Sequence, residues 1–355
     1  MKLSKNFFAI AFAAQLLLSA SGPAFAADEN TDSEAMKKAE TFYKSCGVDP
    51  KKLKAAAAGF RDVIVQEPNN AKAHMRLGAI SAAMEEYDAA ILSEKQAVKI
   101  DPKYFLPHVV LGQIYANQGK FKEALPEFEQ AVKLKPTSPR ANMDLGLAQA
   151  QLGHVDEAIV AYKKAAELTP KDPNAHLNLG VLLAQQQKYA EAIKEEKEAI
   201  ALDKNIPEAH IDLGNIYGES GDFDNAKAAF KDALKLVPKH PNALSGLGWV
   251  LWSKGDYKGA IEEQRKALKV DPSFATARRR LAEALAANAE PVEADKEFKA
   301  VLKQSPRDCT AHVEYAKFLE TQGNRDQARS ECKKALEIQP ESKTAQECLK
   351  KLNGG

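Results

Sequence analysis

Histidines are the residues of this chain that could most readily hold a metal ion or move a proton. The chain has 7, and five of them recur at multiples of 34 residues: His74, His108, His176, His210 and His312. The ligands of one zinc ion lie about 2 Å from it, and histidines separated by a whole structural repeat are too far apart to share an ion. We therefore expect these side chains to pack inside the protein, and the sequence predicts no metal site.

Other catalytic patterns are missing from the sequence as well. It contains no Ser-His-Asp or Cys-His set, no glycine-rich loop suited to phosphates and no isolated pair of carboxylates. Runs of Glu and Lys, such as residues 195–198, are typical of a solvated helix face. The sequence thus favours a protein that is not an enzyme and needs no cofactor.

An internal repeat of 34 residues predicts the helices that carry these side chains. The repeats start at residues 71, 105, 139, 173, 207, 241, 275 and 309, without any insertion. Position 7 of each repeat is Leu or Tyr, position 8 is Gly or Ala, position 20 is Ala and position 27 is Ala or Val. This spacing is helical, and the small residues let two helix backbones approach closely.

Glycine and proline mark the ends of the predicted helices. Position 15 is Gly in five repeats, which suits a left-handed turn after the first helix. Position 32 is Pro in seven repeats, where it ends the second helix. Each repeat is therefore predicted to be a helix, a tight turn, a second helix and a short connection, and a period of this length indicates a solenoid.

The pattern resembles the tetratricopeptide-repeat (TPR) family over residues 71–342, because Leu, Gly, two Ala and Pro recur together in one register. The resemblance implies an all-α, right-handed α-solenoid of about eight to nine helix-turn-helix units. Residues 37–70 continue the register as a degenerate unit, and residues 343–355 form a capping helix and tail. In this family the first helices line a concave groove that receives a peptide or protein segment.

The resemblance also implies which side chains line the groove, because contacts in the family come mainly from positions 2, 5, 9, 12 and 13 of the first helices. Together these positions form an apolar stripe bordered by amides, which would bury apolar side chains and bond an extended backbone. The predicted groove residues are Met75, Val109, Gln113, Met143, Leu147, Gln151, Leu177, Val181, Gln185, Ile211, Asn215, Trp249, Trp252 and Arg279.

Two tryptophans, the only ones in the chain, fall at positions 9 and 12 of one repeat. Trp249 and Trp252 could face a ligand, since tryptophan is enriched among binding hot spots. They could instead pack against neighbouring helices, because position 12 is small in most other repeats. Of the three consecutive arginines that follow in the next repeat, we expect only Arg279 to face the groove.

The four cysteines do not have the spacing of a zinc site. Cys332 falls on the last second helix and Cys348 on the capping helix, and a short turn would bring them to the same height. They could form a disulfide, or both could be small buried apolar residues. Cys46 and Cys309 have no evident partner.

The N-terminus has the features of a secretory signal peptide over residues 1–26. Lys2 and Lys5 precede an apolar run over residues 7–18, and residues 24–26 (Ala-Phe-Ala) suit cleavage after Ala26. The run is shorter than the roughly 20 residues that span a bilayer, although an uncleaved anchor is the alternative. We expect residues 27–36 to be mobile and the mature chain to be exported, most simply to a bacterial periplasm, with secretion as a second outcome.

The sequence therefore predicts a non-catalytic scaffold that binds a protein or peptide segment, with no membrane span after cleavage. Its 50 basic and 49 acidic residues offer no electrostatic reason to expect nucleic acid as a partner. A role in assembly or secretion in the bacterial envelope is the first reading. The alternatives are a chaperone-like holder of exported clients and a scaffold associated with polysaccharide.

Overall fold

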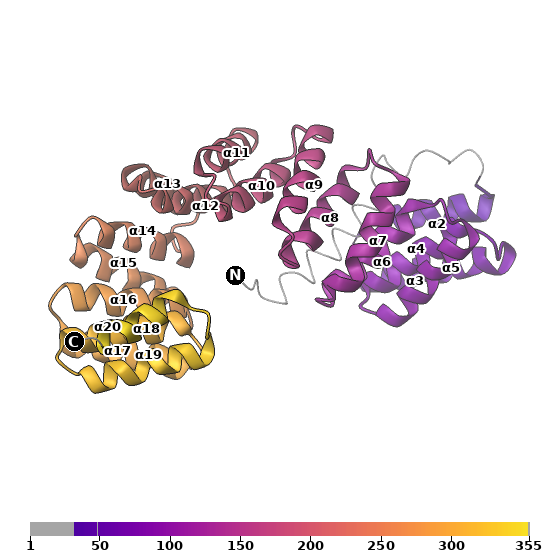
Figure 1. Ribbon diagram of the computed structural model, residues 1–355. Coiled ribbons are helices and arrows are strands. Elements are labelled where there is room, and N and C mark those ends of the chain that lie inside the picture. Colours follow the sequence, from indigo (N-terminus) through magenta and orange to yellow (C-terminus); the bar gives the residue numbers. More distant parts are fainter. Residues whose placement is uncertain (1–31, 48, 354–355) are drawn as a thin grey trace. The chain divides into compact units, whose positions relative to one another are not determined.

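The computed structural model describes residues 32–47 and 49–353 (Figure 1). These residues form nineteen α-helices and no strand, so the predicted all-α class is confirmed. The predicted signal peptide, residues 1–26, lies outside the described residues. The chain divides into two compact units. The first ends at Leu182 and the second begins at Leu183, and each unit is described by itself.

Consecutive helices pack against each other from α2 to α9 and from α11 to α20, as in TPR solenoids. The helices of the first unit are α2 (Glu34–Lys44), α3 (Pro50–Gln66), α4 (Ala71–Ala83), α5 (Tyr87–Ile100), α6 (Phe105–Asn117), α7 (Phe121–Leu134), α8 (Pro139–Gln151) and α9 (Val155–Leu168). Helix α10 (Pro173–Gln185) contains the boundary between the units. The helices of the second unit are α11 (Tyr189–Leu202), α12 (Pro207–Glu219), α13 (Phe223–Leu236), α14 (Pro241–Ser253), α15 (Tyr257–Val270), α16 (Ala275–Ala287), α17 (Pro291–Gln304), α18 (Cys309–Thr321), α19 (Arg325–Ile338) and α20 (Lys343–Asn353).

A first helix begins at each of the eight residues where a sequence repeat begins. Four of these helices start with proline, whose fixed φ and missing N–H suit the first helical position. Some first helices, including α8 that starts with Pro139, are also capped by side chains that accept a hydrogen bond from a free backbone N–H, as Asn70, Ser138 and Asp308 do. Local sequence signals therefore set where the first helices start.

The segment before the repeats differs from the expectation that residues 27–36 are mobile. Helix α2 already begins at Glu34, because Ser33 caps it by accepting a hydrogen bond from the backbone N–H of Met36 at 3.2 Å. Met36 is fully buried, and Asp32 pairs with Lys72 at 2.6 Å. The expectation is thus wrong for residues 32–36, which a cap, an ion pair and apolar burial hold in place.

Glycine at position 8 makes room for one particular side chain, the residue at position 24 of the same repeat. A Cβ atom built on Gly112 would lie 2.5 Å from a ring carbon of Phe128, and one on Gly214 would lie 2.9 Å from a ring carbon of Phe230. At Gly78 the same space is filled by Glu94. At these positions the side chain at position 24 therefore fills the space that a Cβ atom on the first helix would occupy.

The turn between the two helices of each repeat is left-handed. The five glycines at position 15 have φ between 74° and 86°. The remaining three repeats place Glu85, Gln187 and Ala289 in the same conformation, with φ of 62°, 60° and 60°. The tertiary packing thus imposes this turn even where no glycine is present to adopt it freely.

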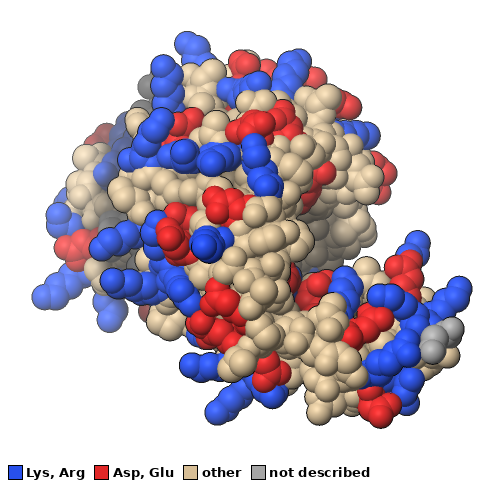
Figure 2. All heavy atoms as spheres, turned by 90° about the vertical axis from the view of Figure 1, so that its left-hand side faces the viewer, with Lys and Arg blue, Asp and Glu red and all other residues tan. Residues whose placement is uncertain are grey.

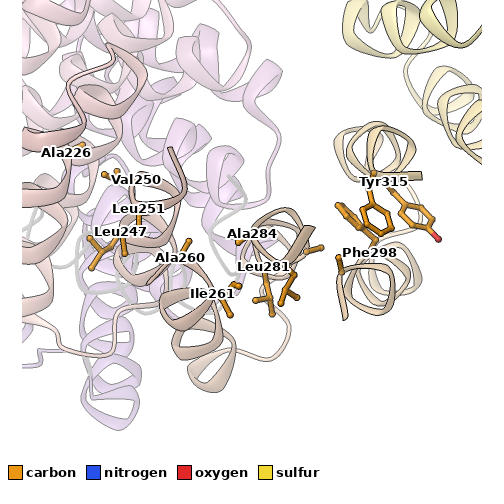
Figure 3. Packing of buried hydrophobic residues seen from close by; sticks show 14 of the residues in the cluster. Ala226, Leu247, Val250, Leu251, Ala260, Ile261, Leu281, Ala284, Phe298 and Tyr315 are labelled. Carbon is orange, nitrogen blue, oxygen red and sulfur yellow. The ribbon is translucent and has the colours of Figure 1, made fainter. Parts of the chain in front are cut away.

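The largest cluster of buried apolar residues in the second unit extends from Ile211 of α12 to Leu352 of α20, and Figure 3 shows part of it. Leu247 and Leu251 of α14 and Leu281 of α16 are among the buried residues that Figure 3 shows. Further along, the Phe298 ring of α17 stacks on the Tyr315 ring of α18, with centroids 5.3 Å apart. Leu352 of the capping helix α20 belongs to the same core, so α20 covers the last apolar surface.

Candidate partner-binding site

The first helices form a continuous surface within each unit, because each one contacts the first helix of the next repeat. These contacts join α4, α6 and α8 in the first unit and α12, α14, α16 and α18 in the second. A side chain must remain accessible on these helices in order to contact a partner. Burial therefore decides which of the predicted groove residues can take part.

Four of the predicted groove residues are buried and are corrected here: Met75, Val109, Gln113 and Ile211. Position 5 points into the space between the second helix of its own repeat and the first helix of the next. Met75, for example, is 0% exposed and packs with Ala97 of α5 and Leu106 of α6. Gln113 is committed elsewhere, because its amide donates a hydrogen bond to Asp144 Oδ2 at 2.6 Å. These side chains hold the solenoid together and are not available to a partner.

The other predicted groove residues remain accessible to different degrees. Gln151, Val181, Gln185 and Trp252 are exposed. A second group is half-buried: Met143, Leu147, Leu177, Asn215, Trp249 and Arg279. Apolar and amide side chains thus occur together on the accessible part of the first helices.

The two tryptophans have different environments, although they are only three residues apart. Trp249 packs edge-on against Phe223, with centroids 6.3 Å apart and planes at 81°. Its ring also covers Gly218, where a Cβ atom would approach a ring carbon to 2.2 Å. Trp252 is 38% exposed. Trp249 is therefore a packing residue for the most part, and Trp252 is the tryptophan of α14 that remains exposed.

The three consecutive arginines of α16 also have different environments. Arg278 pairs with Glu297 of α17 at 2.9 Å. The guanidinium of Arg280 lies 5.5 Å from the centroid of the Trp249 ring. It also donates a hydrogen bond to the Ser245 carbonyl oxygen at 3.2 Å. Burial lowers the pKa of this guanidinium to about 10. Two of the three arginines are thus held by the protein itself.

Arg279 is paired with Glu283, one helical turn further along α16. Both side chains are half-buried, and burial raises the pKa of the Glu283 carboxyl. Glu283 occupies position 9, as Trp249 does in the preceding repeat and Asn215 in the one before. We define the tryptophan surface as Asn215, Trp249, Trp252, Arg279 and Glu283.

The chemistry that this surface offers is recognition by contact. An exposed indole can bury apolar side chains, and the nearby amide and ion pair can bond a peptide backbone or a charged group. On the face shown in Figure 2, basic and acidic side chains are intermixed. Within the described residues, no three His, Cys, Asp or Glu groups gather to hold a metal ion, and no helix is long and apolar enough to cross a membrane.

Position 4 of the repeat has a structural role that sequence reasoning missed. Its side chain bonds the backbone carbonyl six residues earlier, at the end of the preceding repeat. This contact is made by His74, Asn142, His210, Arg278, His312 and Gln346, at distances of 2.9–3.3 Å. In most repeats a polar residue stands six positions after a proline, and this spacing is the sequence signal for the contact. These histidines therefore clamp the connection between repeats, in addition to packing.

One of these histidines has acceptors on both sides of its ring. Nδ1 of His312 lies 2.6 Å from a carboxylate oxygen of Glu331, and Nε2 lies 3.1 Å from the Pro306 carbonyl oxygen. This arrangement fixes the last repeat internally and leaves His312 buried.

Comparison with known proteins agrees with the fold. A chain of the APC/C hetero-tetramer Cut9–Hcn1 superposes with a TM-score of 0.58 at 17% identity, covering 85% of this chain and 59% of that one. A tetratricopeptide-repeat protein from Parabacteroides merdae gives a TM-score of 0.63 at 17% identity, covering 71% of this chain and 99% of that one. At this identity the likeness concerns the fold alone, and no curated protein matches the chain.

Family comparison covers most of the chain. One tetratricopeptide-repeat family model matches residues 52–105, 109–173, 152–207 and 211–273, and two further models of the same description match residues 251–312 and 310–342. The matches cover almost all of the 34-residue register over residues 71–342 and begin before it, at residue 52. The chain belongs to the tetratricopeptide-repeat family.

Proposed function

We propose that this chain is a non-catalytic scaffold that holds a protein segment against the tryptophan surface, in assembly or secretion in the bacterial envelope. Membership of the TPR family supports the general part of this proposal, since TPR proteins bind peptide or protein partners. The specific part rests on the residues of α12, α14 and α16 and on the N-terminal sequence.

The observation that carries the proposal is the exposure of Trp252 on a packed helical surface. A tryptophan with 38% of its surface exposed leaves apolar area that a partner can cover. Trp249 behind it is fixed by Phe223 and Gly218, so the surface is already formed before a partner arrives. A preformed surface loses little conformational entropy on binding. Most of the entropy loss can then fall on the partner, so the partner can be an extended segment that becomes ordered on docking.

Capture of partners from an envelope extract tests this site. We expect Trp252→Ala to weaken capture roughly 30-fold, because an aromatic hot spot contributes about 2 kcal/mol to binding. Val292→Ala is the matched control, since Val292 is 84% exposed and lies on α17, which carries no residue of the tryptophan surface. Equal capture by the wild type and by Trp252→Ala would place binding elsewhere.

The pattern of captured proteins distinguishes the alternatives. One stoichiometric partner supports an adaptor in assembly or secretion. Many weakly held clients would favour a chaperone-like holder, for which the half-buried Met143 and Leu147 of α8 offer adaptable apolar contacts. A change in tryptophan fluorescence on adding saccharide would favour a scaffold associated with polysaccharide.

Export is proposed from the sequence of residues 1–26, and one further observation supports it. Cys332 of α19 and Cys348 of α20 are joined as a disulfide, with an S–S distance of 1.98 Å. Disulfides persist mainly in oxidising compartments. A bacterial periplasm meets this condition, and secretion from the cell would meet it as well.

Intact-mass measurement on protein recovered from the envelope fraction tests both points. We expect a chain that starts at Ala27 and gains the mass of two hydrogens on reduction. A chain that keeps residues 1–26 would support an uncleaved anchor. A mass unchanged by reductant would show that Cys332 and Cys348 remain separate thiols.

A further inference from the structure

A row of exposed apolar side chains crosses three second helices of the first unit. Leu92 of α5 is 70% exposed, Val160 of α9 is 67% exposed, and Pro126 of α7 between them is also exposed. All three stand at position 22 of their repeats, so the repeat places them on one face. We call them the apolar row.

The apolar row is not part of the core of its own unit. On the same helices the residues at positions 20, 24 and 27 are buried, such as Ala158, Tyr162 and Ala165 on α9, where Ile159 and Ala161 are buried as well. Second helices of the other unit have polar or small residues at position 22, namely Lys194, Ala228, Glu262, Lys296 and Ser330. A single exposed apolar residue needs no explanation, but several in register mark an interaction surface.

Charged residues flank the apolar row in a consistent order on its two outer helices. On α5 the exposed Asp88 precedes Leu92 by four residues, and the exposed Lys95 follows it by three. On α9 the exposed Glu157 precedes Val160 by three residues, and the exposed Lys163 follows it by three. Residues three or four apart share a helix face. The face therefore runs from acidic through apolar to basic.

Helix α7, between the outer two, carries both signs on each side of Pro126. Lys122 and Glu123 precede Pro126, and Glu129 and Lys133 follow it. The middle helix therefore neither opposes nor adds to the order of charge. The polarity of the face comes from α5 and α9.

We propose that the apolar row is the contact surface for a second copy of this chain. A two-fold axis parallel to the row would set Leu92 against Leu92 and Val160 against Val160 of the two copies. The same axis places the acidic side of one copy opposite the basic side of the other, so that Asp88 meets Lys95 and Glu157 meets Lys163. A two-fold axis perpendicular to the row would oppose like charges.

This self-complementarity is the reason to assign a second copy as the occupant. Closed two-fold dimers use one surface twice, so the surface must match itself. A face that is apolar along the axis and opposite in charge on either side meets that condition. The inference goes beyond the proposed function, because it uses second helices of the first unit and not the tryptophan surface.

Sedimentation of the purified full-length gene product across a range of concentrations tests the proposal. We expect the wild type to sediment as a dimer, and the double variant Leu92→Glu/Val160→Glu to sediment as a monomer with unchanged helicity. Val292→Glu is the control, because it makes the same kind of substitution once at an exposed valine outside the row, and it should remain dimeric. A wild type that stays monomeric at every soluble concentration would overturn the proposal.

Charge exchange distinguishes a second copy from any other occupant. The variants Lys95→Glu/Lys163→Glu and Asp88→Lys/Glu157→Lys should each dimerise at least tenfold more weakly, because each opposes like charges. An equimolar mixture should recover the dimer as a mixed pair, in which every opposition is again between unlike charges. A mixture that remains monomeric would contradict the pairing, and so would a dimer unaffected by either variant.

Discussion

At the scale of single residues, Trp249 and Trp252 show how one helical turn separates structure from recognition. Position 9 of α14 meets Gly218 of the preceding first helix, and its indole also contacts Phe223 and Arg280. Position 12 emerges at the surface. The sequence could identify both tryptophans as unusual, but the contacts that separate them come from helices in other repeats.

Substitution of each tryptophan should therefore have a different effect on stability. We expect Trp249→Ala to lower the free energy of unfolding by about 2 kcal/mol or more, because it leaves a cavity above Gly218. Trp252→Ala should change the free energy by less than about 1 kcal/mol. Urea denaturation followed by circular dichroism measures both, and an equal loss in the two variants would contradict the assignment.

At the scale of the helix pair, the turn at position 15 shows packing overriding local preference. Ala289 has a φ of 60°, a conformation that glycine adopts without a steric penalty and alanine does not. The helices on either side, α16 and α17, are packed against each other, so the turn has no alternative path.

Replacing Ala289 with glycine should stabilise the protein. We expect Ala289→Gly to raise the free energy of unfolding by about 0.5–1 kcal/mol, after the larger entropy of glycine in the unfolded chain is counted. Gly323→Ala, at the same position with a φ of 78°, is the reciprocal control and should destabilise by a similar amount. Thermal unfolding compares the three proteins, and a loss of stability in Ala289→Gly would show that the turn is not strained.

At the scale of the whole molecule, two repeats carry a buried acid where most others carry an aromatic ring. Position 24 is Phe128, Phe230 or Phe298 in three repeats, but Glu94 and Glu196 in two others. Both glutamates are 0% exposed, and their carboxyl oxygens have no hydrogen-bond partner among the described residues. Burial raises the pKa of the Glu94 carboxyl well above its usual value and that of Glu196 to about 9.

The raised pKa values make the stability of the chain depend on pH. The pKa of glutamate in the unfolded chain is about 4.5. Below this pH Glu196 carries its proton in both the folded and the unfolded chain, so its ionisation does not lower the free energy of unfolding. Above it, the unfolded chain releases a proton that folded Glu196 keeps until about pH 9, so the free energy of unfolding falls as pH rises. The slope for one group approaches about 1.4 kcal/mol per pH unit within this window.

Glu196→Gln tests this dependence, because glutamine keeps the shape and does not titrate. Denaturation between about pH 5 and pH 8 should show the variant gaining stability relative to the wild type as pH rises. Parallel curves for the two proteins would mean that Glu196 is ionised in the folded chain.

The helices, their order and the residues at which they start follow from signals that lie close together along the chain. Capping side chains, proline and glycine act within a few residues of the chain, and a 34-residue register repeats them. Packing between repeats sets which side chains of the first helices stay accessible. Met75 and Gln113 were expected in the groove and are buried, because position 5 and part of position 9 are covered by the next repeat. Exposure depends on neighbours that spacing along one helix does not specify, so the binding surface emerges only when repeats are stacked.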